Sequence, residues 1–369
     1  MKFLNFPWTV RKEVFEHLTI PEVLAFSRIS KNQNSHIQWT LKTRLLSKVD
    51  YISYYSQGMD TCVISYANSY ERVNFLAMKP SSEAENLESK VQMNFFRMDL
   101  ECCLSTDTQP FTIFCTPQAG PIILQTIHNA LYNFFGPKVI YEVRTSLGTY
   151  LPKLPNISSA ALKLASLKPQ DAAEKLQEFF AVSPEINWLF LTNDRRKFET
   201  RPKLPDTIQN LEISRCGSCG QDILENFNGK QLNLDLTDLK TEDVVRFLKR
   251  WKQNEYYVNL EYLRILESMS ANQYNTAEII HKLEVQWFDK EFEPPLHPSY
   301  NRSTFTTNPD IEFYSTYFTS RNYIERDSDG HVAYVQITEN YIRFGAWNMT
   351  LEELMKYKPV PSKNVEYRL

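Results

Sequence analysis

The chain has little glycine, almost no excess of charge and no long hydrophobic run. Only nine of its 369 residues are glycine, which disfavours the glycine-rich loops that cradle phosphate groups. The formal net charge of −3 at pH 7 lacks the basic excess that nucleic-acid-binding domains carry. We therefore expect no nucleic acid among the partners of this protein.

Segments that would direct the chain to a membrane are also missing from the sequence. No stretch approaches the eighteen or so uninterrupted apolar residues of a membrane-spanning helix. The opening MKFLNFPW is too short, and too soon interrupted by proline and charge, for a secretory signal. We expect no membrane association, a cytoplasmic or nuclear location and reduced thiols at the six cysteines.

Motifs of enzyme active sites are equally scarce. None of the six histidines lies in a His-Glu-x-x-His motif or in a serine nucleophile context. Cys216 and Cys219 form a C-x-x-C motif, but zinc requires four ligands and no second pair lies at a zinc-finger spacing. We predict a non-enzyme with no cofactor and no metal site. A thiol or metal enzyme that uses these two cysteines is kept as an alternative.

The N-terminal residues 6–31 predict two short amphipathic helices joined by a proline-containing turn. Pro7 can open the first helix because its missing N–H would have no helical partner there. Thr19 and Glu22 have the spacing of a capping box that begins the second. A third helix is expected over residues 37–49. The positions that form the apolar surface of the first two helices are Phe6, Pro7, Val10, Val14, Leu18, Ile20, Pro21, Leu24 and Ile29.

These residues resemble an F-box, the helical module by which substrate receptors of ubiquitin ligases dock onto the Skp-type adaptor of a cullin scaffold. The resemblance implies that this apolar surface binds the adaptor. Phe6 stands where the family pattern has leucine, and the tryptophan that many members carry after Ser30-Lys31 is missing. The alternative is an ordinary helical cap whose apolar faces are all internal.

Residues 50–120 change from a helical to an extended pattern. Val73, Phe75 and Ala77 alternate with polar neighbours, as in half-buried strands. We expect a small β-rich connector here.

Residues 121–290 contain a recurring pair of branched apolar residues separated by one position. The pairs recur at intervals of roughly 20 to 30 residues, close to the period of leucine-rich repeats. In addition, the segment from Leu167 to Phe179 matches the segment from Leu239 to Trp251, with one constant offset between the matching positions. The pairs are Leu162-Leu164, Leu189-Leu191, Leu211-Ile213, Leu232-Leu234, Leu263-Ile265 and Leu283-Val285.

A stacked sheet of such repeats would have a binding surface on the face turned away from its core. Side chains between the paired leucines point to that face because alternate residues of a strand face opposite sides. The alternative is that they are ordinary solvated strand residues. The candidate substrate-binding residues are Lys163, Glu212, Asn233, Asp235 and Arg264.

The C-terminal half carries a second resemblance. LKTEDVVRFLKRW followed by VNLEYLRIL is similar to the F-box-associated region of a large nematode F-box family. Residues 326–337 and 341–347 resemble that family's terminal hairpin, with Asp329-Gly330 at the turn.

Together these patterns predict an α+β or α/β chain. We expect an N-terminal three-helix F-box (1–49), a β-rich connector (50–120), a leucine-rich-repeat-like strand-helix sheet (121–290) and a C-terminal hairpin and tail (291–369). The resemblances imply a non-catalytic substrate-recognition subunit of a Skp-cullin-F-box ubiquitin ligase. It would bind the Skp-type adaptor, through it the cullin, and an unknown protein substrate. An interaction scaffold that engages no ligase is the alternative.

Overall fold

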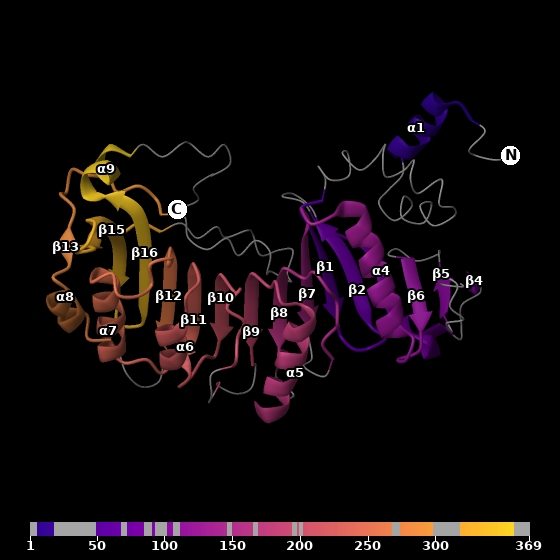
Figure 1. Ribbon diagram of the computed structural model, residues 1–369, viewed down its shortest axis with the longest axis horizontal. Helices are drawn as coiled ribbons and strands as arrows, with labels where there is room; N and C mark the ends of the chain where they lie inside the picture. The colour runs from indigo at the N-terminus through magenta and orange to yellow at the C-terminus, as the bar shows by residue number, and fades with distance from the viewer. Residues whose placement is uncertain are drawn as a thin grey trace. The chain divides into compact units, whose positions relative to one another are not determined.

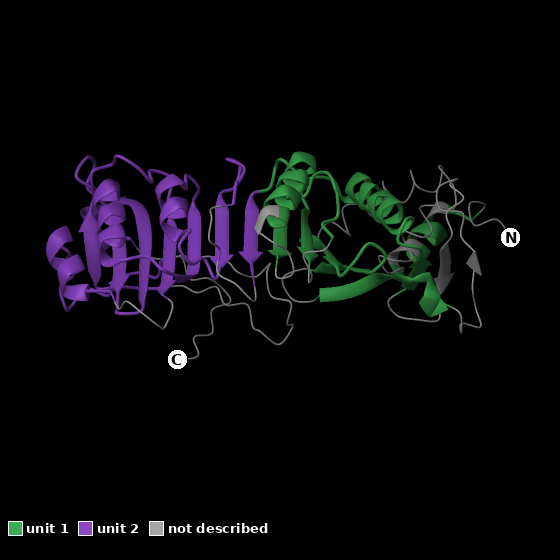
Figure 2. Cartoon of the chain, turned by 90° about the horizontal axis from the view of Figure 1, so that it is seen from below, with its two compact units in different colours: residues 1–186 green, residues 187–369 purple. Residues whose placement is uncertain are grey.

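The computed structural model describes most of the chain as two compact units (Figures 1 and 2), residues 1–186 and 187–369. None of the described helices is long and apolar enough to cross a membrane. The described residues are 6–17, 49–67, 72–84, 91–92, 102–105, 111–145, 150–164, 169–193, 198, 202–267, 274–297 and 318–357.

The first unit contains a mixed β-sheet and three described α-helices. Its strands follow the order β8-β7-β1-β2-β3-β6-β5-β4, with β1 parallel to β7 and antiparallel to β2. The elements are α1 (Trp8–His17), β1 (Tyr51–Ser56), β2 (Cys62–Ala67), β3 (Arg72–Pro80), the 3-10 helix η2 (Ser81–Ala84), β4 (Val91–Gln92), β5 (Cys102–Ser105), β6 (Phe111–Cys115), α4 (Gly120–Phe135), β7 (Ile140–Thr145), β8 (Ser159–Lys163) and α5 (Pro169–Val182).

The second unit contains a sheet in the order β13-β14-β15-β16-β12-β11-β10-β9. Strands β9 to β12 run parallel to their neighbours, and β16 joins β12 in antiparallel pairing. The elements are β9 (Trp188–Thr192), β10 (Asn210–Ser214), α6 (Gly220–Asn226), β11 (Gln231–Thr237), α7 (Thr241–Lys252), β12 (Tyr262–Glu267), α8 (Thr276–Leu283), β13 (Gln286–Trp287), β14 (Asn322–Glu325), β15 (His331–Ile337), β16 (Tyr341–Thr350) and α9 (Leu351–Lys356).

The core of the second unit lies between its sheet and helix α7. Leu232, Leu263 and Phe344 occupy matching positions on three neighbouring strands, and each is fully buried. Trp251 of α7 contacts the Phe344 ring edge-on, with ring centroids 5.1 Å apart. An edge-on pair adds to the stability gained by burying both rings. The paired leucines therefore face the helix layer.

The internal duplication proposed from sequence corresponds to a repeated strand-helix unit. Strands β8 and β11 begin at Ser159 and Gln231, and helices α5 and α7 begin at Pro169 and Thr241. The two strand starts are therefore separated by the same stretch of sequence as the two helix starts. Leu248 and Trp251 of α7 are buried, as are their counterparts on α5. The same apolar positions therefore dock each helix against a sheet.

The predicted fold class is wrong. The described residues form mixed β-sheets with helices spread along the chain, rather than a three-helix domain, a connector and a repeat sheet. Strands β1 to β3 are no connector, because β1 pairs directly with β7. Strand β12 pairs with β16 in antiparallel fashion, which a stack of identical repeats does not contain. Of the expected N-terminal helices, the third lies almost wholly outside the described residues.

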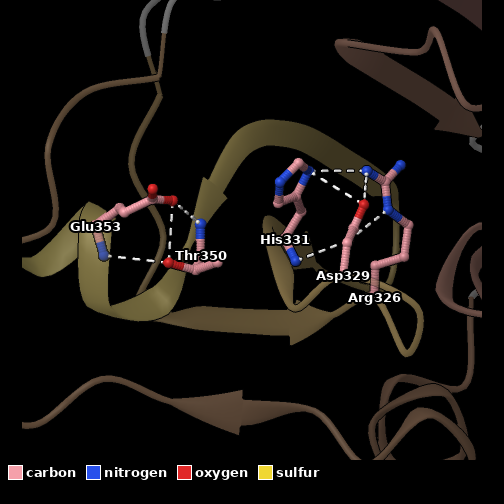
Figure 3. Close-up of polar contacts among 5 residues, drawn as sticks. All are labelled: Arg326, Asp329, His331, Thr350 and Glu353. Carbon is pink, nitrogen blue, oxygen red and sulfur yellow. Dashed lines mark hydrogen bonds and ion pairs between the residues drawn. The ribbon is translucent and has the colours of Figure 1, made fainter.

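The C-terminal hairpin is held by a polar cluster at its turn (Figure 3). Asp329 and Gly330 lie between the antiparallel strands β14 and β15, and Gly330 has a φ of +70°, which a glycine adopts without strain. Arg326 donates to both carboxylate oxygens of Asp329, at 3.0 and 2.6 Å. The backbone N–H of His331 donates to the same carboxylate. The turn is thus fixed by charge-assisted hydrogen bonds.

Replacement of Trp251 by alanine should lower the free energy of unfolding by about 3 to 5 kcal/mol, because it leaves a large cavity in the core. The matched control is Trp287→Ala, since Trp287 is 60% exposed and should change stability by about 0.5 kcal/mol or less. Urea unfolding of both variants measures the difference. Equal effects would show that α7 does not pack on the sheet as described.

The Asp329 turn should make stability depend on pH in the acid range. The Arg326 hydrogen bonds, with help from the His331 amide, hold the pKa of Asp329 below its usual value. The stabilisation is therefore complete above the unfolded-state pKa of about 3.9 and is lost as pH falls through the lower folded-state pKa. Asp329→Asn should be less stable than wild type at neutral pH and should converge with it in acid.

The control for this experiment is Asp327→Asn, because the Asp327 carboxylate is 58% exposed and lies 4.0 Å from Lys252. Unfolding midpoints measured across the acid range should match wild type for the control. A stability gap for Asp329→Asn that persists at the lowest pH would contradict the assignment.

Candidate functional site

The sheet of the second unit presents a polar row on the face opposite to the one that packs against α7. Glu212, Asn233 and Arg264 are direct neighbours on β10, β11 and β12. The row continues with Arg343 on β16 and Gln336 on β15. These residues alternate along their strands with the buried apolar residues, so the two sets face opposite sides. We call these five residues the cross-strand polar row.

The structure brings together four of the five predicted substrate-binding residues. Asn233 and Arg264 are register partners, and Arg264 forms an ion pair with Asp235 at 3.8 Å. Glu212 is fully buried and Asn233 is only 3% exposed, whereas the prediction had both on an open surface. Lys163 is half-buried on β8, in the other unit, and is not placed with them.

Sequence reasoning missed the two residues that complete the row, Arg343 and Gln336. The signal was present, because Arg343 alternates with the buried Ile342 and Phe344, as a strand with one buried face requires. It was missed because the pairing of β16 with β12 joins residues far apart in the sequence.

An aromatic cluster covers the same face beside the polar row. Tyr262 and Tyr334 flank Gly345 in the register, two positions from Arg343. The rings of Phe318 and His297 lie over Gly345, where an added Cβ would come within 2.8 and 2.9 Å of them. Only glycine fits this position. The cluster therefore covers the part of this face around Gly345. The polar row lies at the edge of the covered part.

The predicted adaptor-binding surface is described only in part. Val10 and Val14 lie on α1 and are 42% and 38% exposed, and their spacing of four puts them on one side of the helix. Pro7 is exposed and Phe6 is half-buried. The remaining predicted positions, Leu18, Ile20, Pro21, Leu24 and Ile29, lie outside the described residues.

Cys216 and Cys219 lie at the junction between β10 and α6 and are almost fully buried. Their sulfur atoms are 3.6 Å apart, and Cys219 donates to the Cys216 carbonyl at 3.0 Å. The neighbouring Cys219 thiol and burial raise the pKa of Cys216 above its usual value, the opposite of what a nucleophilic thiol requires. Among the described residues no group of three or more metal-binding side chains comes together.

The core of the first unit contains a buried histidine and a buried ion pair. His128 contacts the Tyr54 hydroxyl at 2.9 Å and the Pro155 carbonyl at 2.6 Å, and burial lowers the pKa of His128 to about 4. Glu142 and Arg144 form a buried ion pair, and burial raises the pKa of Glu142 despite its partner. This histidine and this ion pair have structural partners and are not candidate catalytic groups.

A hollow beside the start of β10 is too small for a typical ligand. It is lined by Leu204, Ile208 and Ile223 among others and has a volume of about 90 Å³. Pockets for small molecules generally measure roughly 300 to 1,000 Å³. The cross-strand polar row is therefore a better candidate site than this hollow.

Part of the second unit matches a known protein family. Residues 199–265 match the F-box associated family. The match spans β10, α6, β11 and α7 and most of β12, so it includes three members of the polar row. No curated protein and no solved structure compared with the chain matches it significantly. The chain therefore has an F-box-associated region over these residues.

The two buried cysteines should react slowly with Ellman's reagent in the native protein. A thiol that is buried, with a raised pKa, exposes little thiolate to the reagent. The double variant Cys216→Ser/Cys219→Ser should therefore leave the fast-labelled fraction unchanged and reduce only the label taken up after unfolding. Loss of a fast-labelled thiol in the variant would restore the hypothesis of a thiol enzyme.

Proposed function

We propose that the protein is the substrate-recognition subunit of a Skp-cullin-F-box ubiquitin ligase. The observation that carries the proposal is the match of residues 199–265 to the F-box associated family, together with the F-box-like residues at the N-terminus. In this role the chain is non-catalytic and works in the cytoplasm or nucleus.

The exposed side of α1 supports the adaptor-binding half of the proposal. Val10 and Val14 are more than a third exposed, although apolar side chains gain free energy when they leave water. A helix that presents apolar residues one turn apart is the usual element that docks into a partner's groove. The partner we propose for this side of α1 is the Skp-type adaptor, which links the chain to the cullin.

The substrate-binding half of the proposal rests on the sheet of the second unit. Its polar row is built on rigid strands, which hold a binding surface more accurately than loops do. A receptor that holds a target lysine near the charged conjugating enzyme raises its effective concentration. Proximity of this kind accelerates transfer without any catalytic group on the receptor.

The double variant Val10→Asp/Val14→Asp should reduce co-purification of a Skp-type adaptor by at least about tenfold, because docking would bury two unpaired carboxylates. Lys12→Asp is the matched control, since position 12 lies about 200° around the helix from Val10 and is exposed. Pull-down with purified adaptor, quantified against input, measures the loss.

Circular dichroism of each variant should match wild type, so that a loss of binding is not a loss of fold. Full retention of the adaptor by the double variant would contradict the proposed docking surface. A wild-type chain that binds no Skp-type adaptor at all would favour the interaction scaffold that engages no ligase.

A further inference from the structure

Two arginines of the cross-strand polar row lie directly opposite each other. Arg264 on β12 and Arg343 on β16 are register partners in an antiparallel pair, and both are half-buried. Like charges at directly opposite positions of a sheet repel and destabilise it. Such a pair is tolerable when an anion lies between or beside the two guanidinium groups.

The chain supplies a described counter-ion to only one of the two arginines. Arg264 forms its ion pair with Asp235 at 3.8 Å. For Arg343 the described residues provide no ion pair, and its buried Nε atom has no hydrogen-bond partner among them. Its guanidinium carbon lies 5.2 Å from the centroid of the Tyr341 ring, which orients the group without neutralising it. Arg343 is thus the arginine of the row to which the described residues supply no ion pair.

Amide side chains on either side of the arginines also have unused hydrogen-bonding atoms. Asn233 is only 3% exposed, and its Oδ1 atom accepts no hydrogen bond from the described residues. Gln336 is next to Arg343 in the register, and its Oε1 atom likewise accepts no hydrogen bond from the described residues. Buried polar atoms without partners are rare because they lose their water without compensation. Two of them lie in line with Arg343, to which the described residues supply no ion pair.

We propose that the cross-strand polar row binds an acidic segment of the substrate protein, and that Arg343 holds one carboxylate of that segment. This inference rests on the proposed function and names its substrate class. A guanidinium group donates two parallel hydrogen bonds to a carboxylate, and Arg343 is only half-buried, so part of its side chain is open to the segment. Tyr341 supplies an aromatic wall beside the carboxylate.

The charge count of the row selects a carboxylate over a phosphate group. Arg264 is paired with Asp235 at 3.8 Å, whereas Arg343 forms no ion pair with the described residues. A single carboxylate matches the one arginine left without a counter-ion. A dianionic phosphate group would add a second negative charge on the face that also carries Asp235, and like charges repel.

The test measures fluorescence anisotropy of labelled peptides added to the full-length chain. The probe is a peptide of alternating glutamate and alanine, which presents its carboxylates on one side when extended. The reference peptide has glutamine in place of glutamate. We expect saturable binding of the glutamate peptide only. Because the chain has a net charge of −3, non-specific attraction of an acidic probe is disfavoured.

Arg343→Gln should weaken binding of the glutamate peptide by about tenfold or more. Arg343→Lys keeps a positive charge and should weaken binding less than Arg343→Gln does. The matched control is Arg246→Gln, which removes an arginine from α7, where Arg246 is paired with Glu225 at 2.8 Å. Arg343→Gln should also unfold at the same or a higher urea concentration than wild type, because it removes the repulsion with Arg264. A purely structural Arg343 would instead make the variant less stable.

Several results would overturn the proposal. Equal binding of the glutamate and glutamine peptides would do so, as would tighter binding of a phosphoserine-alanine peptide. Failure of peptide binding with intact adaptor co-purification would reject the polar row alone, whereas loss of the adaptor would reject the proposed function.

Discussion

The alternation of side chains across paired strands is the constraint on which the second unit depends. Register sets Leu263 beside Phe344 on one face and Arg264 beside Arg343 on the other. A slip of one residue in β16 would turn Arg343 toward Trp251 and expose Phe344. Because Phe344 is fully buried against the Trp251 ring, that slip would lose most of the core contact with α7. Packing on the helix side therefore fixes the geometry of the polar side.

The candidate binding surface is a consequence of the same constraint. Parallel sheets usually have helices on both faces, but the polar row carries charges and amides that no helix core would accept. The aromatic cluster covers the positions around Gly345. The polar row lies at the edge of this cluster. In this account the adaptor and the substrate use different surfaces, the exposed valines of α1 and the polar row. A receptor that carries both binding surfaces on one chain keeps the substrate at a high effective concentration near the adaptor.

Local sequence patterns predicted the strands and helices better than they predicted how these pair. The leucine pairs from Leu162 to Ile265 mark β8 to β12, and the duplicated segment marks α5 and α7. The strand predicted at Leu283 and Val285 was wrong, because Leu283 ends α8 and Val285 lies outside the described strands. Pairing of β1 with β7 and of β12 with β16 could not be predicted, since periodicity says nothing about distant partners. For the same reason Arg343 was missed as a member of the polar row.

The central claim is that one chain binds an adaptor and an acidic substrate segment through two independent surfaces. The most direct measurement is a titration of the alternating glutamate-alanine peptide into the full-length chain, alone and then with saturating Skp-type adaptor. The account predicts the same dissociation constant in both titrations. A peptide that the adaptor displaces, or that binds neither form, would contradict it.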